Sequence, residues 1–147
     1  MNDVVAYQEQ PREIKYCHEG KDKLYFPDCL VILSDGRGVF VEIKPLFTMA
    51  IDQNICKWHA LKTFCEENGY GCLMTTGTKS INHYYAQKYT ETFEMDLLKA
   101  LDEVGSLSWA EYKKIKTRHE TLKNDLCTII LKNDLKFNIR PFRLKRR

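Results

Sequence analysis

Residues 25–45 read YFPDCLVILSDGRGVFVEIKP, and this pattern determines how the N-terminal half of the chain folds. Two apolar runs flank the turn sequence SDGRG at residues 34–38, which predicts an antiparallel hairpin. Asp28 stands at the start of one strand, and Glu42 and Lys44 stand near the end of the other. Because side chains alternate along a strand with a period of two, Glu42 and Lys44 share a face. The hairpin therefore gathers two carboxylates and an ammonium group.

This set of groups is typical of a divalent-metal site that activates a water molecule. Hard cations prefer oxygen ligands, so Asp28 and Glu42 are the candidate metal ligands. The backbone carbonyl of Ile43 is a further candidate, because its side chain faces away while its backbone lies beside the site. Lys44 is placed to orient or deprotonate water, or to offset charge at a phosphate. Such a site can hydrolyse a phosphodiester bond.

Each of these residues also has a simpler interpretation. Asp28, after Pro27, is compatible with a plain turn or bulge, and Glu42 and Lys44 with a weak ion pair on a half-exposed strand. Charged groups set among apolar strand residues nevertheless need a reason to be there. Taken together around one hairpin, the three residues favour a catalytic site.

The composition is that of an ordinary globular protein. The chain has 147 residues, of which 44% are hydrophobic and 29% charged, enough for one domain or two very small ones. No apolar run approaches the roughly 18 residues that span a bilayer, and no signal peptide is recognisable, so we expect a cytoplasmic protein with no membrane partner. The six cysteines are interpreted as thiols in a reducing compartment. The spacing of Cys56, His59, Cys65 and Cys72 matches no common zinc module.

The pattern up to residue 76 predicts an α/β arrangement. Residues 52–68 have the apolar spacing of an amphipathic helix, and residues 71–75 form a short apolar strand. A strand, a helix and a strand in sequence favour a parallel pair with a right-handed crossover. The remaining expected strands are residues 4–7, 13–17, a long strand at 23–33, and 39–44.

The region after residue 92 changes to helical character. Residues 93–104 form one expected helix, and capping boxes at Ser108-Trp-Ala-Glu111 and Thr117-Arg-His-Glu120 predict helices at 108–116 and 117–131. Short strands are expected at 135–137 and 142–144. Three helices followed by a β-ribbon is the outline of a small winged-helix-like α+β region.

Charge is distributed unevenly. Residues 1–92 carry 10 basic and 12 acidic side chains, whereas residues 93–147 carry 13 basic and 8 acidic ones. A basic face suits a polyanion such as DNA, although a solvated surface or a protein contact is compatible with the same charges. The candidate DNA-binding residues are Lys57, Lys113, Lys114, Lys116, Arg118, Lys123, Arg146 and Arg147.

At this point the sequence resembles the PD-(D/E)XK nuclease superfamily, in which Pro27-Asp28 and Glu42-Ile43-Lys44 match the two halves of the motif. The stretch VVAYQEQP at residues 4–11, together with YFPD at 25–28, VEIKP at 41–45 and Lys57-Trp58, narrows the resemblance to the N-terminal domain of TnsA-type transposon endonucleases and their phage relatives.

The resemblance implies a restriction-endonuclease-like mixed sheet with flanking helices, and DNA cleavage assisted by Mg²⁺ or Mn²⁺ in transposition or phage DNA processing. Taken with the helical pattern described above, it predicts a nuclease-like core at 1–76, a linker at 77–92 and a basic winged-helix-like region at 93–147, which is similar to the family only in outline. That region would contact DNA or a partner such as a transposase or an ATPase regulator. Nucleases of this fold often pair to cut both strands, which suggests a homodimer.

One feature departs from the family pattern. The family usually has a helix before the first strand that donates another acidic residue to the metal site, whereas this sequence begins at the strand. Glu9, Glu13 and Glu19 are nearby carboxylates, but none is on such a helix. Either Asp28 and Glu42 suffice, or another subunit supplies the carboxylate, or the protein is a catalytically impaired DNA-binding or assembly protein. A winged-helix regulator that uses its N-terminal domain only to dimerise is a further alternative.

Overall fold

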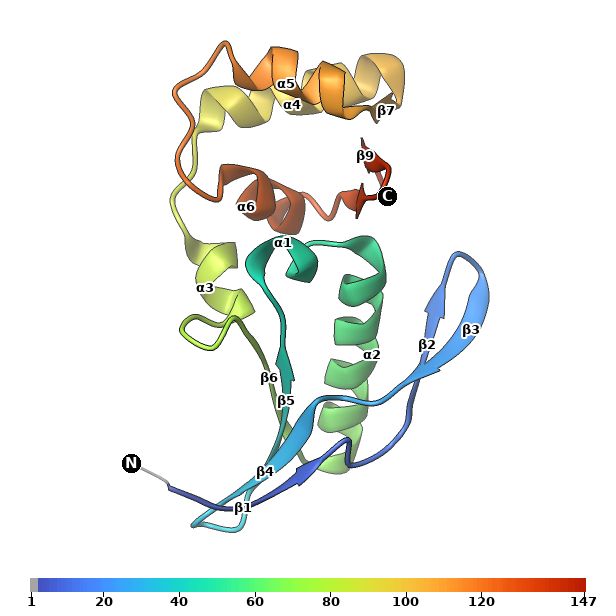
Figure 1. Ribbon diagram of the computed structural model, residues 1–147, viewed down its shortest axis with the longest axis vertical. Coiled ribbons are helices and arrows are strands. Elements are labelled where there is room, and N and C mark those ends of the chain that lie inside the picture. Colours follow the sequence, from blue (N-terminus) through green and yellow to red (C-terminus); the bar gives the residue numbers. More distant parts are fainter. Residues whose placement is uncertain (1–2) are drawn as a thin grey trace. The chain divides into compact units, whose positions relative to one another are not determined.

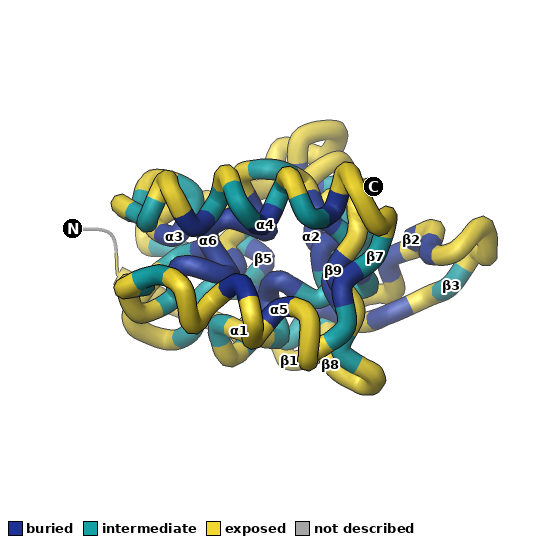
Figure 2. The backbone as a smooth tube through the Cα atoms, turned by 90° about the horizontal axis from the view of Figure 1, so that it is seen from above, coloured by how far each residue is buried: buried dark blue, intermediate teal, exposed yellow. Residues whose placement is uncertain are grey.

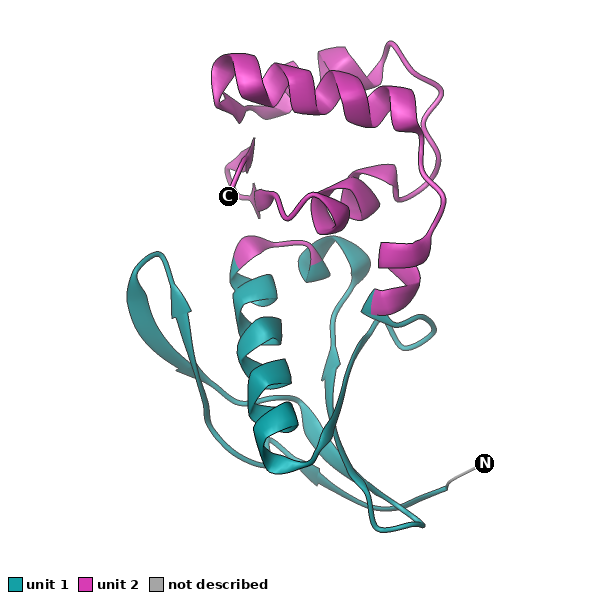
Figure 3. Cartoon of the chain, turned by 180° about the vertical axis from the view of Figure 1, so that it is seen from behind, with its two compact units in different colours: residues 1–49, 53–81 teal, residues 50–52, 82–147 magenta. Residues whose placement is uncertain are grey.

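The computed structural model describes residues 3–147, which form two compact units (Figures 1 and 3). The first unit contains residues 3–49 and 53–81, and the second contains residues 50–52 and 82–147. Within residues 3–147, no helix is both long enough and apolar enough to cross a membrane.

The first unit is built on a four-stranded mixed sheet. Its order is β1 (Val4–Glu9), β4 (Cys29–Leu33), β5 (Gly38–Ile43) and β6 (Gly71–Thr75), with β6 parallel to β5 and the other pairs antiparallel. The crossover passes through the short helix α1 (Leu46–Met49) and through α2 (Asp52–Asn68). The predicted hairpin, crossover helix and parallel pair are therefore confirmed, as is the mixed α/β class.

One face of this sheet packs on α2, and the other does not. Along β5 the buried residues Gly38, Phe40 and Glu42 alternate with residues that are more exposed. Figure 2 colours the whole backbone by how far each residue is buried. The ring of Phe40, which is 1% exposed, lies edge-on to Phe64 of α2 and to Tyr70. On the opposite face no residue of the β4 and β5 ladder is fully buried. Glu42 thus lies on the covered side, next to the core.

The prediction of one long strand at residues 23–33 is wrong. Residues Ile14–His18 (β2) and Lys21–Tyr25 (β3) form a separate two-stranded sheet, and β4 begins only at Cys29. Pro27 lacks an N–H for ladder pairing and restricts its neighbour, so the chain leaves one sheet before it enters the next. This break places Asp28 at the point where β4 starts.

The second unit combines helices with a small sheet. Its helices are α3 (Ile81–Ala86, within the residues expected as a linker), α4 (Glu91–Val104), α5 (Trp109–Lys116) and α6 (Asp125–Lys132). The strands β7 (Ser106–Leu107), β8 (Lys136–Ile139) and β9 (Phe142–Lys145) form an antiparallel sheet in the order β7-β9-β8.

Of the two expected capping boxes, only the first forms. The Ser108 hydroxyl accepts from the Glu111 N–H at 3.4 Å, and the Glu111 carboxylate accepts from the Ser108 N–H at 2.7 Å. The helix predicted from Thr117 begins instead at Asp125. The buried Asp125 carboxylate accepts from the N–H groups of Leu122 and Thr90, at 2.8 and 3.2 Å, and so fixes the preceding segment as a loop.

Candidate active site

The predicted catalytic residues meet where the β4–β5 ladder ends. The last paired positions there are Cys29 and Val41, and Asp28 lies just before Cys29. The Asp28 carboxylate accepts from the Ile43 N–H at 2.7 Å, and the Asp28 N–H donates to the Glu42 carboxylate at 3.3 Å. Each carboxylate therefore binds the backbone of the opposite strand, which holds both in place without a ligand.

Lys44 connects the two carboxylates. Its Nζ lies 2.7 Å from Glu42 Oε1 and 4.0 Å from Asp28 Oδ2. The Glu42 side chain is 6% exposed, whereas those of Lys44 and Asp28 are 24% and 43% exposed. The site thus runs from a buried carboxylate, through an ammonium group, to a carboxylate that faces solvent.

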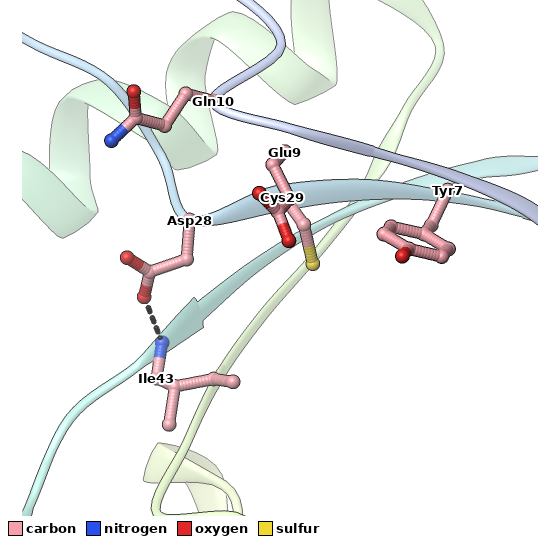
Figure 4. Close-up of a pocket in the computed structure, with 6 residues that line it drawn as sticks. All are labelled: Tyr7, Glu9, Gln10, Asp28, Cys29 and Ile43. Carbon is pink, nitrogen blue, oxygen red and sulfur yellow. Dashed lines mark hydrogen bonds between the residues drawn. The ribbon is translucent and has the colours of Figure 1, made fainter.

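Beside Asp28 lies an open pocket of about 620 Å³ (Figure 4). Its lining includes Ile43, Tyr7, Glu9 and Gln10, and the Gln10 N–H donates to the Asp28 carbonyl at 3.0 Å. The sequence alone did not assign Tyr7, Glu9 and Gln10 to the site, because these residues join it only through the pairing of β1 with β4. The signal that could have found them is the stretch VVAYQEQP at residues 4–11, which contributes to the family resemblance.

Cys29, which lines the pocket, lies close to several carboxylates. This residue lies opposite Glu9 in the β1–β4 ladder. Burial raises the pKa of the Cys29 thiol, and the charges of Asp28, Glu9 and Glu42 raise it further. All three carboxylates therefore act on the Cys29 thiol, and two of them, those of Asp28 and Glu9, belong to residues that line the pocket.

Tyr25 is a buried residue near the carboxylates of Glu42 and Asp28. Burial first, and then the charge of Glu42, raise the pKa of Tyr25 well above its ordinary value, so the phenol stays protonated. Its hydroxyl donates to the Lys57 carbonyl at 3.1 Å. The Lys57 ammonium lies 5.6 and 5.4 Å from the ring centroids of Tyr16 and Tyr25. Lys57, a predicted DNA contact, is therefore held over two aromatic rings of the first unit.

The other predicted DNA-binding residues belong to the second unit and fall into two groups. Those on α5 and in the segment after it are exposed: Lys113, Lys114, Lys116, Arg118 and Lys123. The C-terminal arginines are engaged by carboxylates. Arg146 makes two hydrogen bonds to Asp102, at 3.0 and 3.2 Å, and Arg147 pairs with Asp52 and Asp134 at 2.7 and 2.9 Å.

The donor atoms around Asp28 suit a hydrated hard cation. Within residues 3–147, no group of three His, Cys, Asp or Glu side chains is arranged to hold a metal ion. The available ligands are oxygens of Asp28 and Glu42, and an ionised carboxylate has lone pairs left after one or two hydrogen bonds. Mg²⁺ typically keeps several waters and binds one or two carboxylates, so the residues present fit Mg²⁺ or the similar Mn²⁺.

The sequence of residues 1–76 matches a known protein family. The model of one protein family, described as TnsA-like endonuclease N terminal, matches residues 1–76. The matched segment contains all of the residues around Asp28 and ends directly after β6. No curated protein matches the chain.

Proposed function

Because the chain belongs to the family of TnsA-like endonuclease N-terminal domains, we propose that it is a metal-dependent endonuclease that hydrolyses phosphodiester bonds in DNA. The observation that carries the proposal is the cluster of Asp28, Glu42 and Lys44 at the end of the β4–β5 ladder, beside an open pocket. Carboxylates flanked by one ammonium group match the needs of metal-assisted phosphoryl chemistry.

Three groups of this site are assigned to metal binding. Asp28 and Glu42 contribute carboxylate oxygens, and Ile43 contributes its backbone carbonyl. In an antiparallel ladder the N–H and C=O of one residue point to the same neighbour. Since the Ile43 N–H donates to Asp28, its carbonyl is expected on the Asp28 side as well. A bound Mg²⁺ or Mn²⁺ would supply an activated water and neutralise charge at the phosphate.

Lys44 has two roles in this proposal. In the free protein its ammonium neutralises the buried Glu42, at 2.7 Å. In the reaction it orients the attacking water or stabilises the charge that develops on the phosphate oxygens. Its position between both carboxylates, and its partial exposure, support a group that can reach solvent and substrate.

The second unit is assigned to recognition. Its order of α4, β7, α5, α6, β8 and β9 supports the winged-helix-like interpretation. However, α6, the helix that follows α5, is buried along its length from Asp125 to Leu131. Nucleic acid would therefore meet the basic residues of α5 and the segment after it. A transposase or ATPase regulator, and a second copy for cutting both strands, are the proposed protein partners in transposition or phage DNA processing.

A second candidate function is a catalytically impaired DNA-binding or assembly protein. Two observations favour it: the close Glu42–Lys44 pair already satisfies one carboxylate, and the described residues offer no group of three acidic ligands. The absence of a third ligand would weaken metal binding without abolishing it, so metal binding alone does not separate the two functions. They differ in whether the protein cuts DNA once metal is bound.

The test is cleavage of supercoiled plasmid by the purified protein with Mg²⁺ or Mn²⁺. We expect nicked or linear product from the wild type and none from Asp28→Ala or Lys44→Ala. Asp35→Asn is the matched control, since Asp35 is an exposed carboxylate in the turn of the same hairpin, paired with Arg37 at 2.7 Å. Cutting that persists in both site variants would indicate a contaminant. DNA binding by the wild type without cutting would favour the assembly protein.

A further inference from the structure

Trp109 is a large aromatic residue that the second unit leaves exposed. It is the first residue of α5, and 52% of its surface is accessible. Its ring lies 5.5 Å from that of Tyr112 and 5.3 Å from that of Phe142, and Tyr112 is only 3% exposed. The Ser108–Glu111 capping box fixes the first turn of the same helix. The indole is therefore held on a rigid aromatic base, with part of its surface open to solvent.

Two lysines of α5 lie beside this indole. The Lys113 ammonium lies 5.8 Å from the Trp109 ring centroid, and Lys113 and Lys114 line a shallow hollow of about 350 Å³ next to the ring. Residues at i, i+4 and i+7 share a helix face, so Lys116 follows on the Trp109 side. The carboxylate in this turn, Glu111, is engaged by the Ser108 N–H. The hollow thus combines an aromatic surface with the ammonium groups of two lysines of α5.

We propose that the Trp109 surface, formed by Trp109, Lys113 and Lys114, binds single-stranded nucleic acid. An unpaired base stacks on the indole, and the phosphates on either side of that base meet the two lysines. Stacking on an aromatic side chain beside a positively charged groove is how proteins bind single strands without reading sequence. Bases within a duplex are already stacked on each other, so the surface selects unpaired DNA.

The charge of the hollow favours nucleic acid over a protein helix as the occupant. A purely apolar partner would leave two ammonium groups to be desolvated, whereas phosphates neutralise them and release counterions. The inference rests on the proposed function in one respect: if the protein is a nuclease, its substrate is DNA that contains an unpaired stretch. It assigns that contact to the second unit, separate from the residues around Asp28.

The experiment uses tryptophan fluorescence of the full chain. The chain has two tryptophans, and Trp58 is buried in the first unit at 8% exposure. In a Trp58→Phe background, Trp109 is the sole reporter, and circular dichroism checks that the variant is folded. A short oligothymidylate is titrated without metal, and a blunt duplex of the same length is titrated in parallel. We expect quenching of Trp109 by the single strand and little change with the duplex.

Two sets of variants separate stacking from charge, and their affinities are measured by the fluorescence anisotropy of a dye-labelled oligothymidylate, because Trp109→Ala and Trp109→Phe remove the tryptophan reporter. Trp109→Ala should weaken oligothymidylate binding about tenfold or more, and Trp109→Phe should restore part of it, since an aromatic ring supplies the surface on which the base stacks. Lys113→Gln and Lys114→Gln should each reduce the slope of log affinity against log salt by about 0.7. Met95→Ala is the matched control, because Met95 is an apolar residue, 68% exposed, on the separate helix α4.

The outcomes are decisive in both directions. Quenching by the single strand, with loss of affinity in Trp109→Ala but not in Met95→Ala, supports the proposal. Unchanged Trp109 fluorescence, or equal affinity of the wild type and Trp109→Ala, overturns it and leaves the hollow as a candidate protein contact. Plasmid cleavage measured on the same preparation distinguishes this failure from that of the nuclease proposal, because cleavage depends on Asp28 and Lys44.

Discussion

Replacing Lys44 with Met should destabilise the first unit and make its stability depend on divalent metal. The substitution removes the ammonium that lies 2.7 Å from Glu42, whose side chain is only 6% exposed, and leaves that carboxylate without its cation. Removing one partner of a fully buried ion pair typically costs about 3–5 kcal/mol. Lys44 is 24% exposed, so water partly replaces it, and we expect a loss of about 2 kcal/mol in unfolding free energy.

Divalent metal should recover much of this loss. A cation bound between Asp28 and Glu42 replaces the missing positive charge, so Mg²⁺ should stabilise Lys44→Met more than the wild type. The Glu42→Gln variant removes the negative charge to which both the metal and Lys44 would bind. Mg²⁺ should therefore change its unfolding free energy little. The double variant should be less destabilised than the sum of the two single variants, because the charge left unpaired by Lys44→Met is then absent.

Urea unfolding followed by tryptophan fluorescence measures these effects. In a Trp109→Phe background the signal comes from Trp58, which lies on α2 of the first unit. Midpoints are compared with and without Mg²⁺ at constant ionic strength, and Asp35→Asn is the control. A Lys44→Met midpoint equal to that of the wild type, or identical Mg²⁺ responses of Lys44→Met and Glu42→Gln, would refute the reasoning.

Two further predictions concern the packing and capping that support the two units. Phe40→Ala removes a ring that is 1% exposed and contacts Phe64 and Tyr70, so unfolding free energy should fall by about 3–5 kcal/mol in the same urea experiment; a loss below about 1 kcal/mol would contradict the assignment of Phe40 to the core. Hydrogen bonding to the Ser108 backbone N–H lowers the pKa of Glu111 below its ordinary 4.5. The contribution of this cap to the stability of α5 is therefore fully present above pH 4.5 and is lost as the pH falls through the lowered folded-state pKa of Glu111. The Glu111→Gln variant should reduce the loss of α5 helicity in acid, measured by circular dichroism. An acid profile identical to that of the wild type would exclude this cap.

The sequence predicts the elements whose signals are local. The turn at residues 34–38 fixes the hairpin of β4 and β5, and the helical spacing from Asp52 to Asn68 gives α2 with its observed bounds. The cluster of Asp28, Glu42 and Lys44 follows from that hairpin alone, because strand alternation and the turn define which side chains meet.

Features that depend on pairing between distant segments were not predictable in the same way. Whether the run at 23–33 is one strand or two depends on which sheet each half joins, and only Pro27 hinted at the break. Thr117 satisfies the local pattern of a cap, but the buried Asp125 binds two backbone N–H groups and starts the helix later. Glu9 reaches the pocket through the register of β1 with β4, which no local pattern specifies.

The most direct test of the central claim is the number of Mn²⁺ ions bound per chain, measured by electron paramagnetic resonance of free Mn²⁺ during titration. If Asp28 and Glu42 hold the metal, the wild type binds one Mn²⁺ that Mg²⁺ displaces, and neither Asp28→Ala nor Glu42→Gln retains this site, while Asp35→Asn does. Equal Mn²⁺ binding by the wild type and by folded Asp28→Ala would contradict the account.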